Sequence, residues 1–386
     1  MNIVLFDEKE TWREFLPLTF TRPLGGLRIG ILSIAEKWKF ATKGNVGFLT
    51  QPHLQKKFPL IVADDSICVN GACCPNPDLL AAITALKKEE ALFFQQQLIA
   101  CYGDPQKQEG KKRVEFRGQV LVVKSRPDLF TKNHEALLED FNTITRGRRS
   151  ETISDTVIII GDRSLVFLEK GAKAEACIFN TTSGPVYLAA GSEVMEGSAV
   201  RGPFSLGEHS TLKLNTKIYG ATTIGPHCKV GGEVNNSVIF GYSNKAHDGF
   251  LGNSVIGEWC NLGADTNNSN LKNNYGNVKL YSYRSKAAAD TGLQFCGLIM
   301  GDHSKCGINT MFNTGTVAGV GSNIFGGSFP PTHIPSFSWG GSEGLQQYRL
   351  DKMFETTEKV FARRGIMFDE TEKQLLTDVQ RLAAGA

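Results

Sequence analysis

Aliphatic residues recur at every sixth position through the middle of the chain, without a gap, over eight positions. A repeat of six residues fits neither the 3.6-residue period of an α-helix nor the two-residue period of a strand. It is typical of a parallel β-helix, in which three flat six-residue faces make a triangular coil of about 18 residues. The repeating side chains are therefore expected to stack inside the coil as its core. They are Leu188, Val194, Val200, Leu206, Leu212, Ile218, Ile224 and Val230.

The repeat is interrupted twice. It slips after Val230 and resumes at Phe250, Ile256 and Leu262, then slips again over the polar segment 265–276. Interruptions in a repeat array indicate loops that leave the solenoid, and such loops often carry functional residues. The last frame consists of Met300, Cys306, Phe312, Ala318 and Ile324.

The ends of the chain follow other patterns. Segments 2–6 and 120–123 read as short buried strands, and segments 31–39 and 78–86 have helical spacing. This alternation predicts an α/β domain with a partly parallel sheet. From Glu343 to Ala384 the pattern is helical, with Met353, Val360 and Phe361 on one side, and this tail is expected to pack on the solenoid or on a neighbouring subunit. We expect three parts: residues 1–150, 151–340 and 341–386.

Composition narrows the class of protein. The chain has 386 residues and a net charge of +3, which is too small to argue for a nucleic acid or a membrane surface as partner. No segment approaches the ~20 apolar residues of a membrane helix, and the N-terminus lacks the features of a signal peptide. The nine cysteines are scattered without a Cys-x-x-Cys pair, so we expect a cytoplasmic protein without disulfides.

The first interruption of the repeat contains the best candidate for catalysis. His247 lies in it, and histidine titrates near neutral pH. Asn261 and Asn270 follow, and their amides suit sugar hydroxyls because they both donate and accept hydrogen bonds. For Asn267 and Asn268, an internal asparagine ladder or turn capping is an equally good interpretation.

Residues 155–335 resemble the acetyltransferase half of the bifunctional family that makes UDP-N-acetylglucosamine, glucosamine-1-phosphate N-acetyltransferase fused to N-acetylglucosamine-1-phosphate uridyltransferase. The family motif Lys-Ala-Gly-His-x-x-Tyr-Leu-Gly is matched by segment 245–252, and Asn-x-Gly-Ala-Gly-Thr by segment 261–266. The spacing from His247 to Asn261 agrees with the family. Phe250 and Leu271 stand where the family has tyrosine, and Asn235 where it has a lysine that binds the sugar phosphate.

The resemblance implies a left-handed β-helix that assembles as a homotrimer. It implies acetyl-CoA-dependent N-acetylation of glucosamine-1-phosphate, with His247 as general base, coupled to uridylyl transfer from UTP. It places acetyl-CoA at Ala264 and Gly307. The candidates for the sugar phosphate are cations, amides and one aromatic residue along the solenoid: Arg201, Lys217, Lys245, Phe250, Asn261, Asn270 and Lys272.

The first 150 residues lack the Gly-x-Gly-Thr-Arg loop of family uridyltransferases. Segment 19–30 instead resembles the Arg-Pro-Leu-Gly-Gly-Leu-Arg-x-Gly opening of divergent sugar nucleotidyltransferases, so the domain is expected to be nucleotidyltransferase-like. Glycine backbone and a helix N-terminus favour phosphate, although a plain turn explains the glycine pair equally well. A nucleoside triphosphate would bind Arg22, Gly25, Gly26, Arg28 and Lys37. Possible carboxylate ligands of Mg²⁺ are Asp64, Asp65 and Asp104.

Two other functions fit the same sequence. One is a sugar-1-phosphate nucleotidyltransferase whose β-helix only assembles subunits; the missing tyrosines favour it, and His247 with its spaced asparagines argues against it. The other is a non-enzymatic scaffold or regulator in which both sites have decayed.

Overall fold

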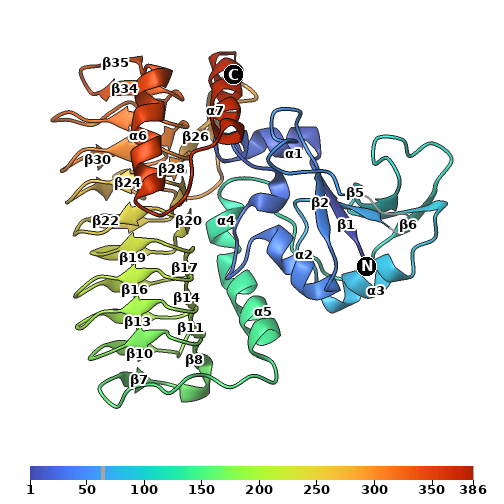
Figure 1. Ribbon diagram of the computed structural model, residues 1–386, viewed down its shortest axis with the longest axis horizontal. Coiled ribbons are helices and arrows are strands. Elements are labelled where there is room, and N and C mark those ends of the chain that lie inside the picture. Colours follow the sequence, from blue (N-terminus) through green and yellow to red (C-terminus); the bar gives the residue numbers. More distant parts are fainter. Residues whose placement is uncertain (62–65, 386) are drawn as a thin grey trace.

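The computed structural model describes residues 1–61 and 66–385. It consists of an N-terminal α/β domain, a left-handed parallel β-helix and two C-terminal helices, which confirms the expected fold class (Figure 1). Two of the proposed magnesium ligands, Asp64 and Asp65, lie outside the described residues. Within the described residues, no helix combines the length and the apolar content needed to cross a membrane.

The α/β domain is built on a six-stranded mixed sheet in the order β2-β1-β3-β5-β4-β6. The strands β2, β1 and β3 are parallel, whereas β5 runs antiparallel to its neighbours. The strands are β1 (Ile3–Phe6), β2 (Val46–Leu49), β3 (Ile67–Asn70), β4 (Glu90–Phe94), β5 (Gln97–Tyr102) and β6 (Lys112–Glu115). The helices are α1 (Lys9–Glu14), α2 (Ile34–Thr42), α3 (Pro77–Thr84), α4 (Asp128–Thr131) and α5 (Asn133–Thr145).

The strand expected at 120–123 is wrong. Leu121, Val122 and Val123 are buried in the core, but Val122 makes an isolated bridge to Cys73 and no ladder forms there with the described strands. Burial without a partner strand explains the difference, because an apolar run alone does not reveal whether a ladder exists.

Three flat faces form the solenoid. The six-strand face contains β7 (Ile158–Ile160), β10 (Ile178–Asn180), β13 (Ala199–Arg201), β16 (Lys217–Tyr219), β19 (Glu233–Asn235) and β22 (Phe250–Gly252). The nine-strand face contains β8 (Val166–Leu168), β11 (Val186–Leu188), β14 (Phe204–Leu206), β17 (Thr222–Ile224), β20 (Val238–Gly241), β23 (Val255–Glu258), β28 (Ile299–Met300), β31 (Val317–Ala318) and β33 (His333–Ile334). The ten-strand face contains β9 (Lys173–Ala174), β12 (Glu193–Val194), β15 (Thr211–Leu212), β18 (Lys229–Val230), β21 (Asn244–Lys245), β24 (Asn261–Leu262), β29 (Lys305–Cys306), β32 (Asn323–Ile324), β34 (Ser338–Gly341) and β35 (Gly344–Gln347). β25 (Asn267–Asn268) and β30 (Met311–Phe312) form a separate two-stranded sheet, and β25 lies next to β22.

The eight aliphatic residues of the six-residue frame are all buried in one core cluster, as expected. The frame after the first interruption differs, because Leu251 rather than Phe250 lies in the core. The coils shorten at this point, so that Thr223 pairs with Val238, only 15 residues later. As a result, the residue that points into the core is one position later than the six-residue frame predicts, Leu251 in place of Phe250.

The second interruption is an insertion between adjacent coils. Val255 pairs directly with Ile299 on the next coil, and the chain leaves the solenoid between β25 and β28. Part of the insertion is the antiparallel hairpin of β26 (Lys279–Ser282) and β27 (Ala287–Asp290). The segment just after β26 contacts the α/β domain: the ring of Tyr283 packs edge-on against Phe20, with the centroids 5.7 Å apart.

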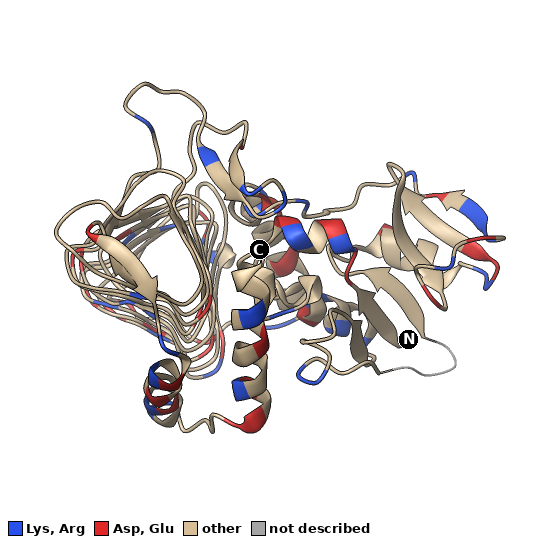
Figure 2. Ribbon diagram, turned by 90° about the horizontal axis from the view of Figure 1, so that it is seen from above, with Lys and Arg blue, Asp and Glu red and all other residues tan. Residues whose placement is uncertain are grey.

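The nine-strand face packs against the α/β domain, and both contribute to one hydrophobic cluster (Figure 2). At this junction the buried guanidinium of Arg22 pairs with the carboxylate of Asp302 and lies 4.7 Å from the ring centroid of Phe240. Further along, the Asn133 amide donates to Ala221 O and to Thr223 Oγ1, both at 3.0 Å. These polar contacts fix the position of the domain on the solenoid.

The C-terminal tail forms two helices, α6 (Leu350–Ala362) and α7 (Glu370–Ala384). The helical pattern was expected from Glu343, but residues 344–347 pair with β34 as the last strand of the ten-strand face. Helix α6 packs on the solenoid, where Phe361 stacks on Trp259 with the centroids 4.1 Å apart. Helix α7 lies between the solenoid and the α/β domain (Figure 2).

Candidate functional site

His247 lies at the corner where the chain passes from the ten-strand face to the six-strand face. Its side chain is exposed. The corner continues through the next coils, because Asp265 N donates to Asp248 O and Asn309 N donates to Ala264 O. The structure therefore places His247 and Ala264 on successive coils of one corner, and Gly307 lies on the coil after that, against Gly263.

The candidates for the sugar phosphate are spread over several places. Lys217 and Phe250 lie near His247. Phe250 begins β22, the strand that follows the His247 corner, and only β19 separates β22 from β16, the strand of Lys217. Arg201 lies at the far end of its strand, three strands from β22. Lys272 belongs to the insertion and donates to Asn277 O at 2.6 Å.

Lys245 occupies an interior position of the coil, next to Val230. Its ammonium donates to Gly231 O at 2.9 Å and to His247 O at 2.8 Å, and only 3% of the residue is exposed. Burial lowers the pKa of this lysine to about 8. This ammonium is not available to a substrate in this structure, and its bond to His247 O instead fixes the corner that carries the histidine.

The asparagines divide into two groups. Asn267 Oδ1 accepts from Phe250 N and Asn268 Oδ1 accepts from Gly252 N, so these two amides cap the backbone of the coil below. Asn270 donates to Asn253 Oδ1 at 2.8 Å and is half-buried. Asn261 is exposed on the ten-strand face. Of the two interpretations of Asn267 and Asn268, these contacts agree with capping of the backbone.

Asn261 lines a cavity of about 380 Å³ between α6 and the ten-strand face, which we call the cationic pocket. No aspartate or glutamate lines it in the described part of the chain. None of its four cations forms an ion pair with a described carboxylate. Its polar lining consists of Lys229, Lys305, Arg363, Arg364, Asn244 and Asn261.

Two polar groups that line the cationic pocket have unused hydrogen-bonding capacity. The Oδ1 atom of Asn244 is buried and has no hydrogen-bond partner among the described residues. The Lys305 ammonium donates to His303 O at 3.0 Å, two residues earlier in the chain, and burial lowers the pKa of Lys305. An anion with hydroxyl groups would pair with the cations and donate to Asn244.

A ladder of stacked rings holds α6 over the cationic pocket. The rings occupy one corner of successive coils, and each of the five residues has a positive φ. From the first ring to the fourth, the centroids of neighbouring rings lie 4.2 to 5.3 Å apart. Phe361 of α6 joins the stack. The rungs are His209, His227, Tyr242, Trp259 and His303.

Sequence reasoning missed both the ladder and the pocket cations. The spacing of His209 and His227, 18 residues and so one coil, was a signal for the ladder. Arg363 and Arg364 lie far from Asn261 in sequence, and nothing in the hydrophobic repeat indicated that the tail would fold back over it.

The residues proposed for the nucleoside triphosphate are used inside the protein. Arg22 pairs with Asp302 and lies 3.2 Å from Glu258. A side chain at Gly25 would place its Cβ 2.6 Å from Leu5 Cδ1, so this glycine permits close packing of the chain on β1. Gly26 packs beside Arg22. It does not line any of the described cavities, so these offer no place for a phosphate next to it.

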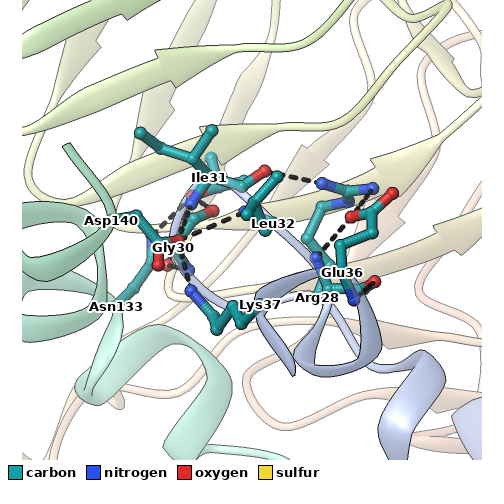
Figure 3. A network of polar contacts seen from close by, with 10 residues as sticks. Arg28, Gly30, Ile31, Leu32, Glu36, Lys37, Asn133 and Asp140 are labelled. Atoms are coloured by element: carbon teal, nitrogen blue, oxygen red, sulfur yellow. Dashed lines mark hydrogen bonds and ion pairs between the residues drawn. The ribbon is translucent and has the colours of Figure 1, made fainter. Parts of the chain in front are cut away.

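Arg28 and Lys37 belong to a polar network that joins α2 to α5 (Figure 3). The Lys37 ammonium pairs with Asp140, whose carboxylate also accepts from the backbone N–H of Ile31 at 2.7 Å. Arg28 donates to Ile31 O at 2.6 Å and pairs with Glu36 at 3.3 Å. Both cations therefore already have partners within the domain.

The structure does not assemble a magnesium site from the described residues. No group of three or more described His, Cys, Asp or Glu side chains is placed to hold a metal ion. Asp104 is exposed and accepts from Gln106 N in its own loop.

Asp7 follows β1 at the edge where the parallel strands end. Its carboxylate accepts from Leu24 N at 2.8 Å and from Thr50 Oγ1. Burial raises its pKa to about 7. The folded protein therefore binds this proton more tightly than the unfolded chain does.

The free energy of unfolding is expected to fall as pH rises from about 4 to about 7. Over this range Asp7 is ionised in the unfolded chain, whereas in the folded protein burial keeps it protonated until about pH 7. The loss amounts to a few kcal/mol at most, at ~1.4 kcal/mol per unit of pKa. Asp7→Asn should flatten this part of the profile in urea unfolding at several pH values. An unchanged slope in the variant would show that Asp7 does not titrate there.

Comparison with known proteins finds no match among curated proteins. Solved structures that resemble part of the chain include an Arabidopsis UDP-N-acetylglucosamine acyltransferase (16% identity, 53% of this chain and 77% of that one, TM-score 0.23), the polysialic-acid-specific acetyltransferase NeuO (12%, 55% and 99%, 0.30) and another UDP-N-acetylglucosamine acyltransferase (14%, 55% and 79%, 0.22). At these TM-scores the likenesses carry no functional argument. Residues 3–149 match the family model described as sugar nucleotidyl transferase, which covers the α/β domain and less than half of the chain.

Proposed function

We propose that the protein is an acetyltransferase that N-acetylates an amino-sugar-1-phosphate, glucosamine-1-phosphate in the first instance, with acetyl-CoA as donor. The observation that carries the proposal is the exposed His247 on a solenoid corner beside Lys217, with Ala264 and Gly307 on the following coils. The cationic pocket adds a place for a substrate phosphate on the adjoining face.

His247 acts as the general base. It removes a proton from the sugar amine while the amine nitrogen attacks the thioester carbonyl carbon. The carbon–sulfur bond then breaks, the amide forms, and the CoA thiolate leaves and takes up a proton. A backbone N–H or an asparagine amide stabilises the oxyanion formed on the way. Hydrogen bonding of Lys245 to His247 O holds the base in place.

The six-strand face is the proposed contact between subunits of a homotrimer. It remains open in this chain, whereas the α/β domain covers the nine-strand face and α6 covers part of the ten-strand face (Figures 1 and 2). Large apolar side chains are exposed on it, as at surfaces that bind other chains. They are Ile158, Ile160, Ile178 and Tyr219.

The proposal is tested by incubating the protein with glucosamine-1-phosphate, acetyl-CoA and UTP. Thiol release and pyrophosphate release are followed separately, so that each half-reaction has its own readout. Thiol release that depends on the amino sugar supports the proposal. Pyrophosphate release without thiol release would favour a nucleotidyltransferase instead.

Arg364→Ala should raise KM for the phosphorylated substrate about 10- to 100-fold, because a hydrogen bond to a charged group contributes ~1.5–3 kcal/mol. The change in kcat should be small, since this contact is similar in the ground and transition states. Lys359→Ala is the control, because Lys359 is an exposed cation in the last turns of α6, shortly before Arg364, but does not line the cationic pocket. Equal KM values for the two variants would exclude the pocket from substrate binding.

A sugar-1-phosphate nucleotidyltransferase with a non-catalytic β-helix is the second candidate. The match of residues 3–149 to the sugar nucleotidyl transferase family favours it. Its nucleotide would have to bind elsewhere than at Arg22 and Lys37, because these cations are paired with Asp302 and Asp140.

A further inference from the structure

Four cationic side chains are buried in the described part of the chain: Arg22, Lys37, Arg126 and Lys245. Arg22 and Lys37 each pair with a carboxylate. Lys245 is bound by two carbonyls, and a lysine can lose its proton. Arg126 differs from all three, because it has no ion pair with a described carboxylate and a guanidinium stays charged.

Arg126 precedes α4 and is 5% exposed. One arm of its guanidinium, Nη2, donates to Tyr281 O at 2.8 Å. The other arm, Nη1, is buried without a hydrogen-bond partner in the part of the chain that the structure describes. The acidic groups that influence it are Tyr283, Cys296 and Glu14, and none of them forms an ion pair with it. A buried charge without a counter-charge strongly destabilises a fold.

Two further polar atoms in the same cluster, Tyr283 Oη and His333 Nε2, are buried and have no hydrogen-bond partner among residues 1–61 and 66–385. The rings lie together: Tyr281 stacks on His333 with centroids 3.4 Å apart, and Tyr283 meets His333 edge-on at 5.9 Å. The three orphaned atoms come from the α/β domain, the insertion and β33. Three independent elements thus bring unused polar groups to one place.

The chemistry of these groups selects the ligand. A guanidinium N–H and a phenol O–H donate hydrogen bonds, and so does one tautomer of a neutral imidazole. Burial, and to a lesser extent Arg126, lowers the pKa of His333 to about 4, so the ring is neutral near pH 7. The cluster therefore carries one positive charge and up to three donors. Water satisfies donors but supplies no counter-charge.

We propose that Arg126, Tyr283 and His333 form a buried binding site for one small inorganic anion of the chloride type. The anion neutralises Arg126 and links the α/β domain, the insertion and the solenoid. The site is separate from the His247 corner and from the cationic pocket, and it does not depend on acetyl transfer.

Thermal unfolding at constant ionic strength tests the proposal, with sodium gluconate replaced stepwise by sodium chloride. Gluconate is too large for a closed site. The Tm should rise with chloride and reach a plateau, as for a ligand that binds only the folded state. Arg126→Met should abolish this dependence of Tm on chloride. Arg284→Met should retain it, because Arg284 is an exposed arginine that follows β26. A flat wild-type response, or a response that survives in Arg126→Met, would overturn the proposal.

Two measurements cover the case in which Arg126→Met does not fold. Tyr283→Phe removes one donor only, and the chloride concentration at half-saturation should increase severalfold. Crystals of the wild type grown in sodium bromide should show an anomalous peak within hydrogen-bonding distance of Arg126 Nη1. An unchanged half-saturation in Tyr283→Phe, or ordered water alone at that position, contradicts an anion site.

Discussion

His247→Ala is expected to lower kcat for acetyl transfer about 10²–10⁴-fold, the usual contribution of a general base. The thermal midpoint should hardly change, because the side chain is exposed and makes no contact in the core. Thiol release from acetyl-CoA at saturating glucosamine-1-phosphate measures the effect. The fold of the variant is checked by its Tm.

His134→Ala is the matched control, since this histidine is exposed on α5, away from the solenoid corner. It should have wild-type rates. Equal rates for wild type and His247→Ala would demote His247 to a structural residue. If the wild type itself releases no thiol, the acetyltransferase proposal fails and the nucleotidyltransferase candidate takes its place.

Asn270 provides a second contrast to His247. A positioning residue should affect KM more than kcat, and Asn270→Ala is expected to weaken substrate binding. The structure adds that its amide donates to Asn253 Oδ1. A modest loss of stability should therefore accompany the change in KM, and urea unfolding separates the two effects.

The solenoid could be predicted because its signal is local and repeated. Each aliphatic residue of the frame is buried by neighbours one coil away, so one rule applies to every coil. The prediction failed where coils change length: one shortened coil put Leu251 in the core instead of Phe250 and turned Lys245 inward. A hydrophobic repeat does not reveal that a lysine fills a core position.

The contacts between distant segments could not be predicted. The Thr-Arg-Pro-Leu-Gly-Gly segment looks like a phosphate loop, because arginine and glycine are the residues that such loops need. They are equally suited to a buried ion pair and a close packing contact, which is how Arg22 and Gly25 are used. The choice depends on Asp302, some 280 residues away, and the sequence of the segment holds no information about it.

The same reasoning applies to the cationic pocket. Asn261 could be singled out from its motif, but Lys305, Arg363 and Arg364 meet it only because the tail turns back over the ten-strand face. The stacking of Phe361 on Trp259 is what brings the tail there. A candidate site made by three separate segments needs the fold before it can be recognised.

Arg22→Met is expected to lower the free energy of unfolding by about 3–5 kcal/mol, the usual effect of removing one partner of a buried pair. The side chains of Arg22 and Asp302 are 5% and 4% exposed, so the remaining carboxylate would be left buried without its counter-charge. Arg28→Met is the control. Its partner Glu36 is 49% exposed, and pairs of this kind contribute ~0–1 kcal/mol.

The double variant Arg22→Met/Asp302→Asn separates the ion pair from other contacts of Arg22. Removing both charges should recover a large part of the lost stability, since no buried charge of this pair remains. Urea unfolding of the wild type, the two single variants Arg22→Met and Asp302→Asn, and the double variant gives the coupling energy between the two residues. Calorimetry with UTP and Mg²⁺ on the same proteins tests the role that the glycine-rich segment suggested. If Arg22→Met abolished UTP binding but left stability unchanged, Arg22 would be a nucleotide ligand and not the residue that fixes the α/β domain to the solenoid.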